Sequence, residues 1–250
     1  MLRCVRCGAE FPPIPLRSNC EKCTGILEYK VDLPKQGDVE FSGPLGFWRY
    51  KQLLPPVRHV VSLGEGGTPL HKAERLAQNL GLKELYLKDE TRNPTNSYRD
   101  RAAALLTSNA IDQDSDTLIC ATNGNMGASL AAYSAKTGLI CHLVVPEVVD
   151  VGKLAQMLAY DAVIEKFGEI LDESIRKAVT IAEETGWYQA TAELNPLVVE
   201  AQKTISYEIC EQFGVPKWIV VSMGSGGTIY SLWKGFKELK QLGITRSLPK

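Results

Sequence analysis

One polar stretch in the first half of the chain decides how the rest of the sequence is interpreted. It runs Lys88-Asp89-Glu90-Thr91-Arg92-Asn93-Pro94-Thr95-Asn96-Ser97-Tyr98-Arg99-Asp100-Arg101. The sequence predicts a β-strand at residues 84–88 and a helix at residues 97–108. The stretch therefore follows the carboxyl end of a strand, which is where sheets of α/β proteins bind their ligands.

Outward from this stretch, strand-like and helix-like segments alternate along the chain. The sequence predicts strands at 117–121, 140–145, 162–166 and 218–222. It predicts helices at 126–136, 152–160, 169–185, 196–212 and 229–239. Such alternation is typical of an α/β fold in which a parallel sheet carries helices on both faces.

The composition limits the classes of function. The chain has 250 residues, of which 44% are hydrophobic, enough to bury the core of one large domain or of two lobes. Its formal net charge of -1 provides no field that would attract nucleic acid at long range, so we expect no nucleic-acid partner. Without a signal peptide or an apolar run of about 18 residues, the sequence predicts a cytoplasmic protein with no membrane contact.

Four of the seven cysteines lie close to the N-terminus, in two Cys-x-x-Cys pairs. They are Cys4, Cys7, Cys20 and Cys23. Two such pairs can turn four thiolates toward one tetrahedral zinc ion, which predicts a zinc ribbon over residues 1–33. A closed four-thiolate site favours a structural role, and contact with nucleic acid or protein is the alternative.

Two loops after predicted strands could bind anions or polar groups. The first contains Gly224, Ser225, Gly226, Gly227 and Thr228. Glycines ahead of a helix let backbone amides approach a phosphate, although a tight turn would also explain them. The second loop contains Thr122, Asn123, Gly124 and Asn125, which could hold a ligand or could simply cap a helix.

Together these motifs resemble the threonine synthase family of fold-type-II pyridoxal-phosphate enzymes. The stretch Ser62-Leu63-Gly64-Glu65-Gly66-Gly67-Thr68-Pro69-Leu70 and the segment from Asn195 to Thr204 occur in the same order as in that family. The resemblance implies two lobes with parallel sheets: a zinc ribbon at 1–33, a connector at 34–62, and a body at 63–250 with a smaller lobe inserted at about 112–188. It also implies more chain after Lys250, so that the C-terminal part of the family fold would be absent here.

The resemblance also implies roles for the two loops. In the family, the loop matching residues 224–228 holds the phosphate of pyridoxal phosphate, and the residue matching Asn125 contacts the hydroxyl of its ring. The substrate carboxylate is received by the residues that match Thr122, Asn123, Gly124 and Ser97. The family reaction converts O-phosphohomoserine to threonine and phosphate.

Arg99 stands where the family has the lysine that forms a Schiff base with the cofactor. A guanidinium remains protonated and cannot act as that nucleophile, but its planar fork can pair with a phosphate or a carboxylate. We therefore consider that Arg99 binds an anionic ligand or that it forms an internal salt bridge. A third alternative is a sequence error or an engineered change. Asn96 and Asp161 replace family glycines, and Asn is among the residues that tolerate positive φ.

The preferred hypothesis is a threonine-synthase-like protein that retains a pocket for pyridoxal phosphate or a phospho-metabolite but lacks normal Schiff-base catalysis. Its expected partners are zinc, a small phosphorylated amino-acid-like ligand, and a second copy or another chain that supplies the C-terminal part. One alternative is an active threonine synthase or related lyase that uses another lysine, such as Lys88, Lys136, Lys153, Lys203 or Lys234. Another is an interaction module built around the zinc ribbon.

Overall fold

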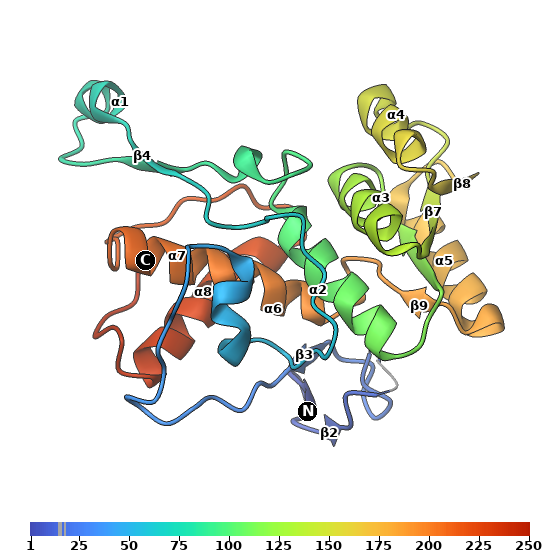
Figure 1. Ribbon diagram of the computed structural model, residues 1–250, viewed down its shortest axis with the longest axis horizontal. Helices are drawn as coiled ribbons and strands as arrows, with labels where there is room; N and C mark the ends of the chain where they lie inside the picture. Colours follow the sequence, from blue (N-terminus) through green and yellow to red (C-terminus); the bar gives the residue numbers. More distant parts are fainter. Residues whose placement is uncertain (15–16, 18) are drawn as a thin grey trace.

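The computed structural model describes residues 1–14, 17 and 19–250 (Figure 1). The elements follow one another in this order: β1 (Leu2–Cys4), β2 (Glu10–Phe11), β3 (Leu27–Tyr29), η1 (Phe47–Leu53), β4 (Leu70–Lys72), α1 (Glu74–Asn79), β5 (Tyr86–Lys88), η2 (Glu90–Arg92), α2 (Arg99–Asp112), β6 (Thr117–Ala121), α3 (Asn125–Thr137), β7 (Ile140–Val145), α4 (Val151–Ala159), β8 (Val163–Lys166), α5 (Leu171–Thr185), β9 (Tyr188–Gln189), α6 (Leu197–Gln202), α7 (Thr204–Gln212) and α8 (Gly227–Gln241).

A four-stranded parallel sheet forms the centre of one half of the molecule, with the strand order β8-β7-β6-β9. Every residue of β6 is buried, as expected for a strand covered on both faces. Leu118 and Cys120 belong to the core that also contains residues of α3, whereas Ile119 and Ala121 pack with Ala178 of α5. In Figure 1, α3 and α5 lie on opposite sides of this sheet. The prediction of a parallel sheet with helices on both faces is confirmed.

Most predicted elements are present, with small shifts at their ends. The strands predicted at 117–121 and 140–145 have those bounds in the structure, while the helix predicted at 97–108 begins at Arg99 and continues to Asp112. The helix predicted at 196–212 is divided at Lys203 into α6 and α7. Lys203 keeps helical dihedral angles at this boundary, with φ of −59° and ψ of −22°, and the hydroxyl groups of Thr204 and Ser206 donate to backbone carbonyls three residues earlier.

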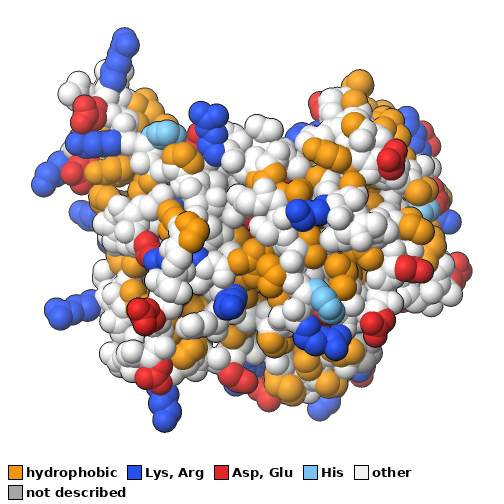
Figure 2. All heavy atoms as spheres, in the orientation of Figure 1, with side chains coloured by type: hydrophobic (Ala, Val, Ile, Leu, Met, Phe, Trp, Pro, Cys, Tyr) orange, Lys and Arg blue, Asp and Glu red, His pale blue; other side chains and the backbone are white. Residues whose placement is uncertain are grey.

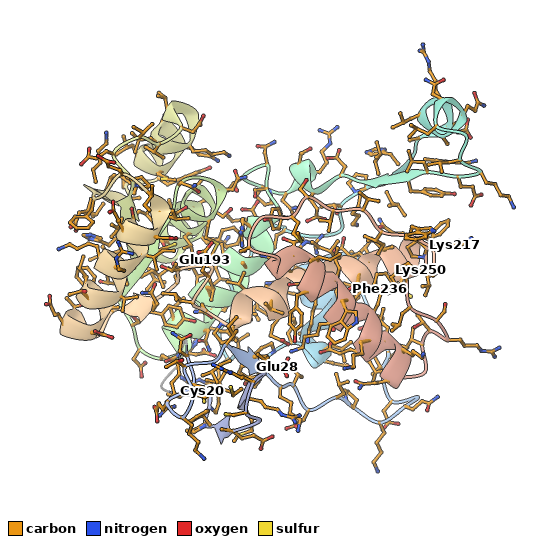
Figure 3. All side chains as sticks on the ribbon, turned by 180° about the vertical axis from the view of Figure 1, so that it is seen from behind. Cys20, Glu28, Glu193, Lys217, Phe236 and Lys250 are labelled. Carbon is orange, nitrogen blue, oxygen red and sulfur yellow. The ribbon has the colours of Figure 1, made fainter. Side chains whose placement is uncertain are left out.

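The prediction of a strand at residues 218–222 is wrong. The segment joins none of the sheets found in the described residues, and Val220 is 96% exposed. The backbone hydrogen bonds found beside it in the described residues join the N–H of Ile219 to the carbonyl of Lys250 and the N–H of Lys250 to the carbonyl of Lys217. Figure 3 shows Lys217 and Lys250 close together. Apolar residues favour a strand, but a strand also needs neighbouring backbone to pair with.

Asn96 and Asp161, at positions where the resemblance implies glycine, adopt the backbone conformation that glycine favours. Asn96 has a φ of 60°, and Asp161 has a φ of 57°. Asn and Asp enter this left-handed region more readily than other residues with side chains. The turn before α2 and the turn before β8 are therefore compatible with these substitutions.

A buried ion cluster holds α2 in place. Arg101 is fully buried, with Nη1 2.5 Å from Glu208 Oε1 and Nη2 2.7 Å from Glu90 Oε1. Lys88 Nζ lies 2.7 Å from Glu208 Oε2. Burial alone would raise the pKa of Glu208, but Arg101 and Lys88 outweigh this effect and lower the pKa to about 2. The cluster fixes the start of α2, where Arg99 lies.

The N-terminal segment packs against the helical half of the molecule. Its three-stranded antiparallel sheet has the order β2-β1-β3. The hydroxyl of Tyr230 in α8 donates to Glu28 Oε2 in β3 over 2.7 Å. After this segment, Phe47 and Tyr50 of η1 are buried, so that aromatic side chains attach this part of the chain to the body.

The surface carries charges of both signs. On the face shown in Figure 2, Lys and Arg side chains are interspersed with Asp and Glu. Within the described parts of the chain, no helix has the length and apolar character needed to cross a membrane.

Candidate functional site

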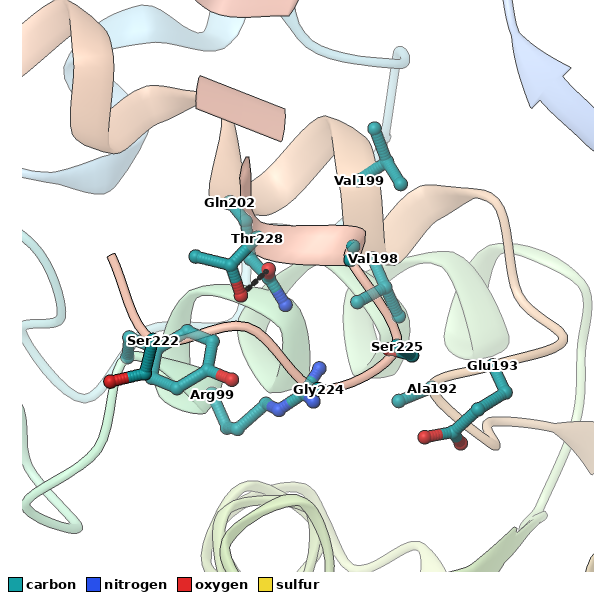
Figure 4. Close-up of a pocket in the computed structure, with 13 residues that line it drawn as sticks. Arg99, Ala192, Glu193, Val198, Val199, Gln202, Ser222, Gly224, Ser225 and Thr228 are labelled. Carbon is teal, nitrogen blue, oxygen red and sulfur yellow. Dashed lines mark hydrogen bonds between the residues drawn. The ribbon is translucent and has the colours of Figure 1, made fainter. Parts of the chain in front are cut away.

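A cavity of about 120 Å³ lies at the start of α8. It is bounded by Arg99 of α2, Gln202 of α6 and the loop of residues 224–228 (Figure 4). Gly226 has a φ of 87°, and no side chain caps the first turn of α8. The first amides of a helix lack partners within it and sit at the positive end of its dipole. This end of the cavity is therefore suited to an anion such as phosphate.

A second cavity, of about 160 Å³, lies at the start of α3. Thr122, Asn123 and Asn125 line it, and the hydroxyl of Thr122 accepts hydrogen bonds from the backbone N–H groups of Gly124 and Gly127. The two cavities share four lining residues, Tyr98, Arg99, Ala192 and Glu193. We call the two cavities together the cleft. Its two ends are the starts of α8 and α3, with Arg99 between them.

Arg99 has no carboxylate partner within the described residues. Its guanidinium carbon lies 5.0 Å from the centre of the Tyr98 ring, and no ion pair is found for it. The interpretation of Arg99 as a partner in an internal salt bridge is therefore wrong for the described part of the structure. The side chain is half-buried and borders both cavities, so that its positive charge is available to a ligand.

The structure brings most of the predicted site residues to the cleft. Residues 224–228 contribute Gly224, Ser225, Gly226, Gly227 and Thr228 to the first cavity, and Thr122, Asn123 and Asn125 line the second. Ser97 and Gly124 are not among the lining residues. The hydroxyl of Ser97 is buried and accepts from the N–H of Arg99 over 3.2 Å, and Gly124 immediately precedes α3. These two residues shape the backbone instead of facing the cleft.

The sequence analysis did not identify Gln202 and Glu193 as binding residues. Gln202 is 1% exposed, and its Nε2 atom has no hydrogen-bond partner among the described residues. Its Oε1 accepts from the hydroxyl of Thr228 over 3.3 Å. Glu193 lies in the loop before α6 and borders both cavities. Gln202 lies in the segment from Asn195 to Thr204 that carries the family resemblance, but the sequence does not report which cavity either side chain faces.

The lysines considered as substitutes for the family lysine lie elsewhere. None of the residues described as lining the cleft is a lysine. Lys88 pairs with Glu208, Lys203 with Glu200, and Lys234 also with Glu200 at 2.6 Å. A protonated lysine held by buried carboxylates is a poor nucleophile.

The four N-terminal cysteines form a cluster that could hold a metal ion. The sulfur atoms of Cys4, Cys7, Cys20 and Cys23 all lie within 4.8 Å of one another. The Sγ atoms are 3.5 Å apart in the pair Cys4 and Cys23, and 3.6 Å apart in the pair Cys7 and Cys20. These separations are close to those of thiolates around one tetrahedral zinc ion. A Cβ at Gly25 would lie 2.9 Å from Cys4 Sγ, so the cluster needs a glycine there.

The parallel sheet and a cleft between the starts of α8 and α3 fit the class of fold-type-II pyridoxal-phosphate proteins. The model of the family described as "Pyridoxal-phosphate dependent enzyme" matches residues 61–247. The chain belongs to this family. Within it, the chain is threonine-synthase-like, as its relatives show.

Similar proteins include two archaeal threonine synthases. The chain is 38% identical to that of Methanosarcina acetivorans, with 100% of this chain and 63% of the relative covered. It is 39% identical to the threonine synthase of Methanocaldococcus jannaschii, with 99% of this chain and 63% of the relative covered. Among solved structures, the chain is similar to a pyridoxal 5'-phosphate-dependent aspartate racemase, with a TM-score of 0.64 and 25% identity. The match covers 69% of this chain and 54% of the racemase chain. The chain thus spans 63% of the length of these threonine synthases.

The cleft fits one end of pyridoxal phosphate and does not fit covalent attachment at the other. The free amides at the start of α8 and the unpartnered Gln202 Nε2 suit the phosphate group. Arg99 occupies the position at which the family resemblance implies the lysine, and a guanidinium does not add to an aldehyde at physiological pH. Among the described residues that line the cleft, groups suited to a phosphate are present and no lysine is found.

Proposed function

We propose that the protein binds a small phosphorylated, amino-acid-like ligand or pyridoxal phosphate in the cleft without forming a covalent bond to it. The observation that carries this proposal is the Arg99 guanidinium, which has no ion-pair partner in the part of the chain that the structure describes and lies beside the start of α8. A cation and free amides that face one small cavity stabilise a phosphate group in two ways, by charge and by hydrogen bonds. The lack of a lysine among the described lining residues supports binding without normal Schiff-base catalysis.

The alternative of an active threonine synthase or related lyase requires a lysine that reaches the cleft. Lys88, Lys203 and Lys234 are committed to buried ion pairs, so this alternative is less well supported. The same proposal assigns a structural zinc ion to the four-cysteine cluster. Its role is to stabilise the ribbon, because residues 1–33 are too few to fold around a core of their own. The interaction-module alternative has no comparable geometric support.

The proposal is tested by calorimetric titration of the purified protein with pyridoxal phosphate and with O-phospho-L-serine, followed by borohydride treatment. We expect reversible binding of at least one of them, and no reduced adduct on any peptide of the chain. Arg99→Leu should weaken binding about tenfold or more, because it removes a hydrogen bond to a charged group. A borohydride-trapped adduct, or no binding of either compound, would contradict the proposal.

A second proposal concerns the exposed segment at residues 218–222. We infer that a second copy of the chain or a partner chain pairs with this edge. The support is the exposure of Val220, at 96%, and of Met223, at 76%, next to the loop that begins the anion site. Hydrogen exchange at the amides of this segment should slow when the protein associates. Equal exchange in the monomeric and associated protein would contradict the pairing.

A further inference from the structure

The strand β3 of the N-terminal segment contacts both helices that bound the cavity at the start of α8. The hydroxyl of Tyr230, in the first turn of α8, donates to Glu28 Oε2 of β3 over 2.7 Å. One turn further along α8, Lys234 Nζ donates to the carbonyl of Tyr29 and lies 2.6 Å from Glu200 Oε1 of α6. The strand β3 also packs against α6. Because α6 and α8 both line this cavity, one strand of the N-terminal segment is attached to two of its walls.

The position of β3 depends in turn on the cysteine cluster. Leu27 of β3 pairs with Cys4 in the antiparallel sheet, and the N–H of Cys20 donates to the carbonyl of Gly25 over 2.8 Å, just before β3. In Figure 3, Glu28 lies on the side of the N-terminal segment that faces the helices. In segments of this size, metal binding supplies most of the folding free energy. Closure of the four thiolates around an ion is therefore what fixes Glu28 and Tyr29 beside α8.

The first turn of α8 has little support of its own. Gly226, with a φ of 87°, precedes it, and no side chain among the described residues caps it. The segment at 218–222 joins none of the sheets in the described residues, and Met223 is 76% exposed. The hydrogen bond from Tyr230 to Glu28 is thus one of the few contacts that hold this turn in place. Holding the amides of the turn in their binding arrangement lowers the ordering cost when an anion binds.

We infer that closure of the cysteine cluster around a metal ion orders the first turn of α8 and thereby raises the affinity of the cleft for an anion. The contact between Tyr230 and Glu28 carries the effect. This inference rests on the proposed function, because it concerns the regulation of the same cleft by the same four cysteines. Coupling between two sites is reciprocal, so an anion in the cleft also strengthens metal binding by the same factor.

The first experiment needs no ligand for the cleft. Hydrogen exchange is measured by mass spectrometry on the full chain, loaded with zinc and after removal of zinc with a chelator. The N–H of Tyr230 donates to the carbonyl of Gly226 over 3.1 Å, so its exchange reports whether the first turn of α8 is formed. Zinc should slow this exchange about fivefold or more and leave the amides of α3 unchanged. Equal slowing in α8 and α3 would overturn the inference, because it would show a general stabilisation.

The second experiment measures the coupling itself. By calorimetry, O-phospho-L-serine should bind the zinc-loaded chain about fivefold or more tightly than the zinc-free chain, and it should raise the zinc affinity by the same factor. Tyr230→Phe removes the hydroxyl but keeps the ring that packs on Trp233, and it should abolish most of this factor. The matched control is Tyr50→Phe, which removes a 2.5 Å hydrogen bond to Glu211 of α7 and should retain the factor.

The outcomes separate this inference from the proposed function. If O-phospho-L-serine and pyridoxal phosphate both fail to bind, the proposed function falls, and the exchange experiment alone decides whether the metal orders α8. If ligand affinity and exchange are the same with and without zinc, the proposed function stands and the inference falls. A zinc effect that persists in Tyr230→Phe overturns the role of Tyr230. Should the zinc-free chain not fold, zinc-loaded Tyr230→Phe is compared with zinc-loaded wild type, and unchanged affinity and exchange would overturn the inference.

Discussion

Lys234 Nζ of α8 donates a hydrogen bond of 2.6 Å to the backbone carbonyl of Tyr29 at the end of β3. The same ammonium group lies 2.6 Å from Glu200 Oε1 of α6, and it is almost fully buried. One charge thus joins the cysteine-rich segment to two helices of the body. One of them, α8, begins at the anion end of the cleft.

Lys234→Met should destabilise the protein by about 3–5 kcal/mol, because it leaves a buried Glu200 carboxylate without one of its cations. Urea unfolding measures this loss. The matched control is Lys237→Met on the same helix, where the exposed ammonium lies 4.5 Å from the Trp233 ring and contributes about 1 kcal/mol or less. If both variants lose the same small amount, the buried contact with Tyr29 does not hold the ribbon to the body.

Stability should fall as the pH falls below the ordinary pKa of a glutamate. In the folded protein, Arg101 and Lys88 lower the pKa of Glu208 to about 2, from an ordinary value of 4.5. A lowered folded-state pKa contributes stability above the unfolded pKa, and this contribution is lost as the pH falls from 4.5 toward 2. The free energy of unfolding should fall by about 3 kcal/mol over this range, as measured by urea unfolding at a series of pH values. Glu208→Gln should flatten this dependence, whereas Glu184→Gln should retain it.

Gly25→Ala should weaken metal binding by the cysteine cluster. A Cβ at this position would lie 2.9 Å from Cys4 Sγ and 3.2 Å from Cys23 Sγ, so the thiolates would have to move. We expect about a tenfold loss of zinc affinity, measured by competition with a chromophoric chelator. Gly46→Ala is the control, because the nearest atom to its Cβ would be 3.8 Å away. Unchanged zinc affinity in Gly25→Ala would show that the cluster does not close around an ion in this geometry.

Arg99→Lys should restore covalent attachment of pyridoxal phosphate. The residue borders both cavities, and a lysine there can present an amine to the aldehyde of the cofactor. After borohydride reduction, mass spectrometry should find the adduct on the peptide that contains residue 99, and it should find none in the wild type. Arg92→Lys, at an exposed position in the same segment, should behave as the wild type. Failure of Arg99→Lys to form the adduct would mean that the cleft does not seat this cofactor.

The sequence predicted the parallel sheet well, and for a clear reason. The strands β6 and β7 are short apolar runs between polar turns, and each is followed by a helix with its own apolar residues. This local pattern almost dictates a parallel arrangement. At residues 218–222, the same kind of pattern predicted a strand that does not form, because pairing depends on a neighbour that local sequence does not report.

The sequence by itself determined the family and the two N-terminal Cys-x-x-Cys pairs, and it predicted the anion-binding loop and the importance of position 99. These features depend on the chemistry of single residues and on short spacings, which are visible in one dimension. The tertiary structure alone decided that, within the described residues, Arg99 has no carboxylate partner, that no lysine lines the cleft, and that Gln202 and Glu193 border it. Those features depend on which side chains from distant segments meet, and burial and charge pairing arise only when the chain has folded.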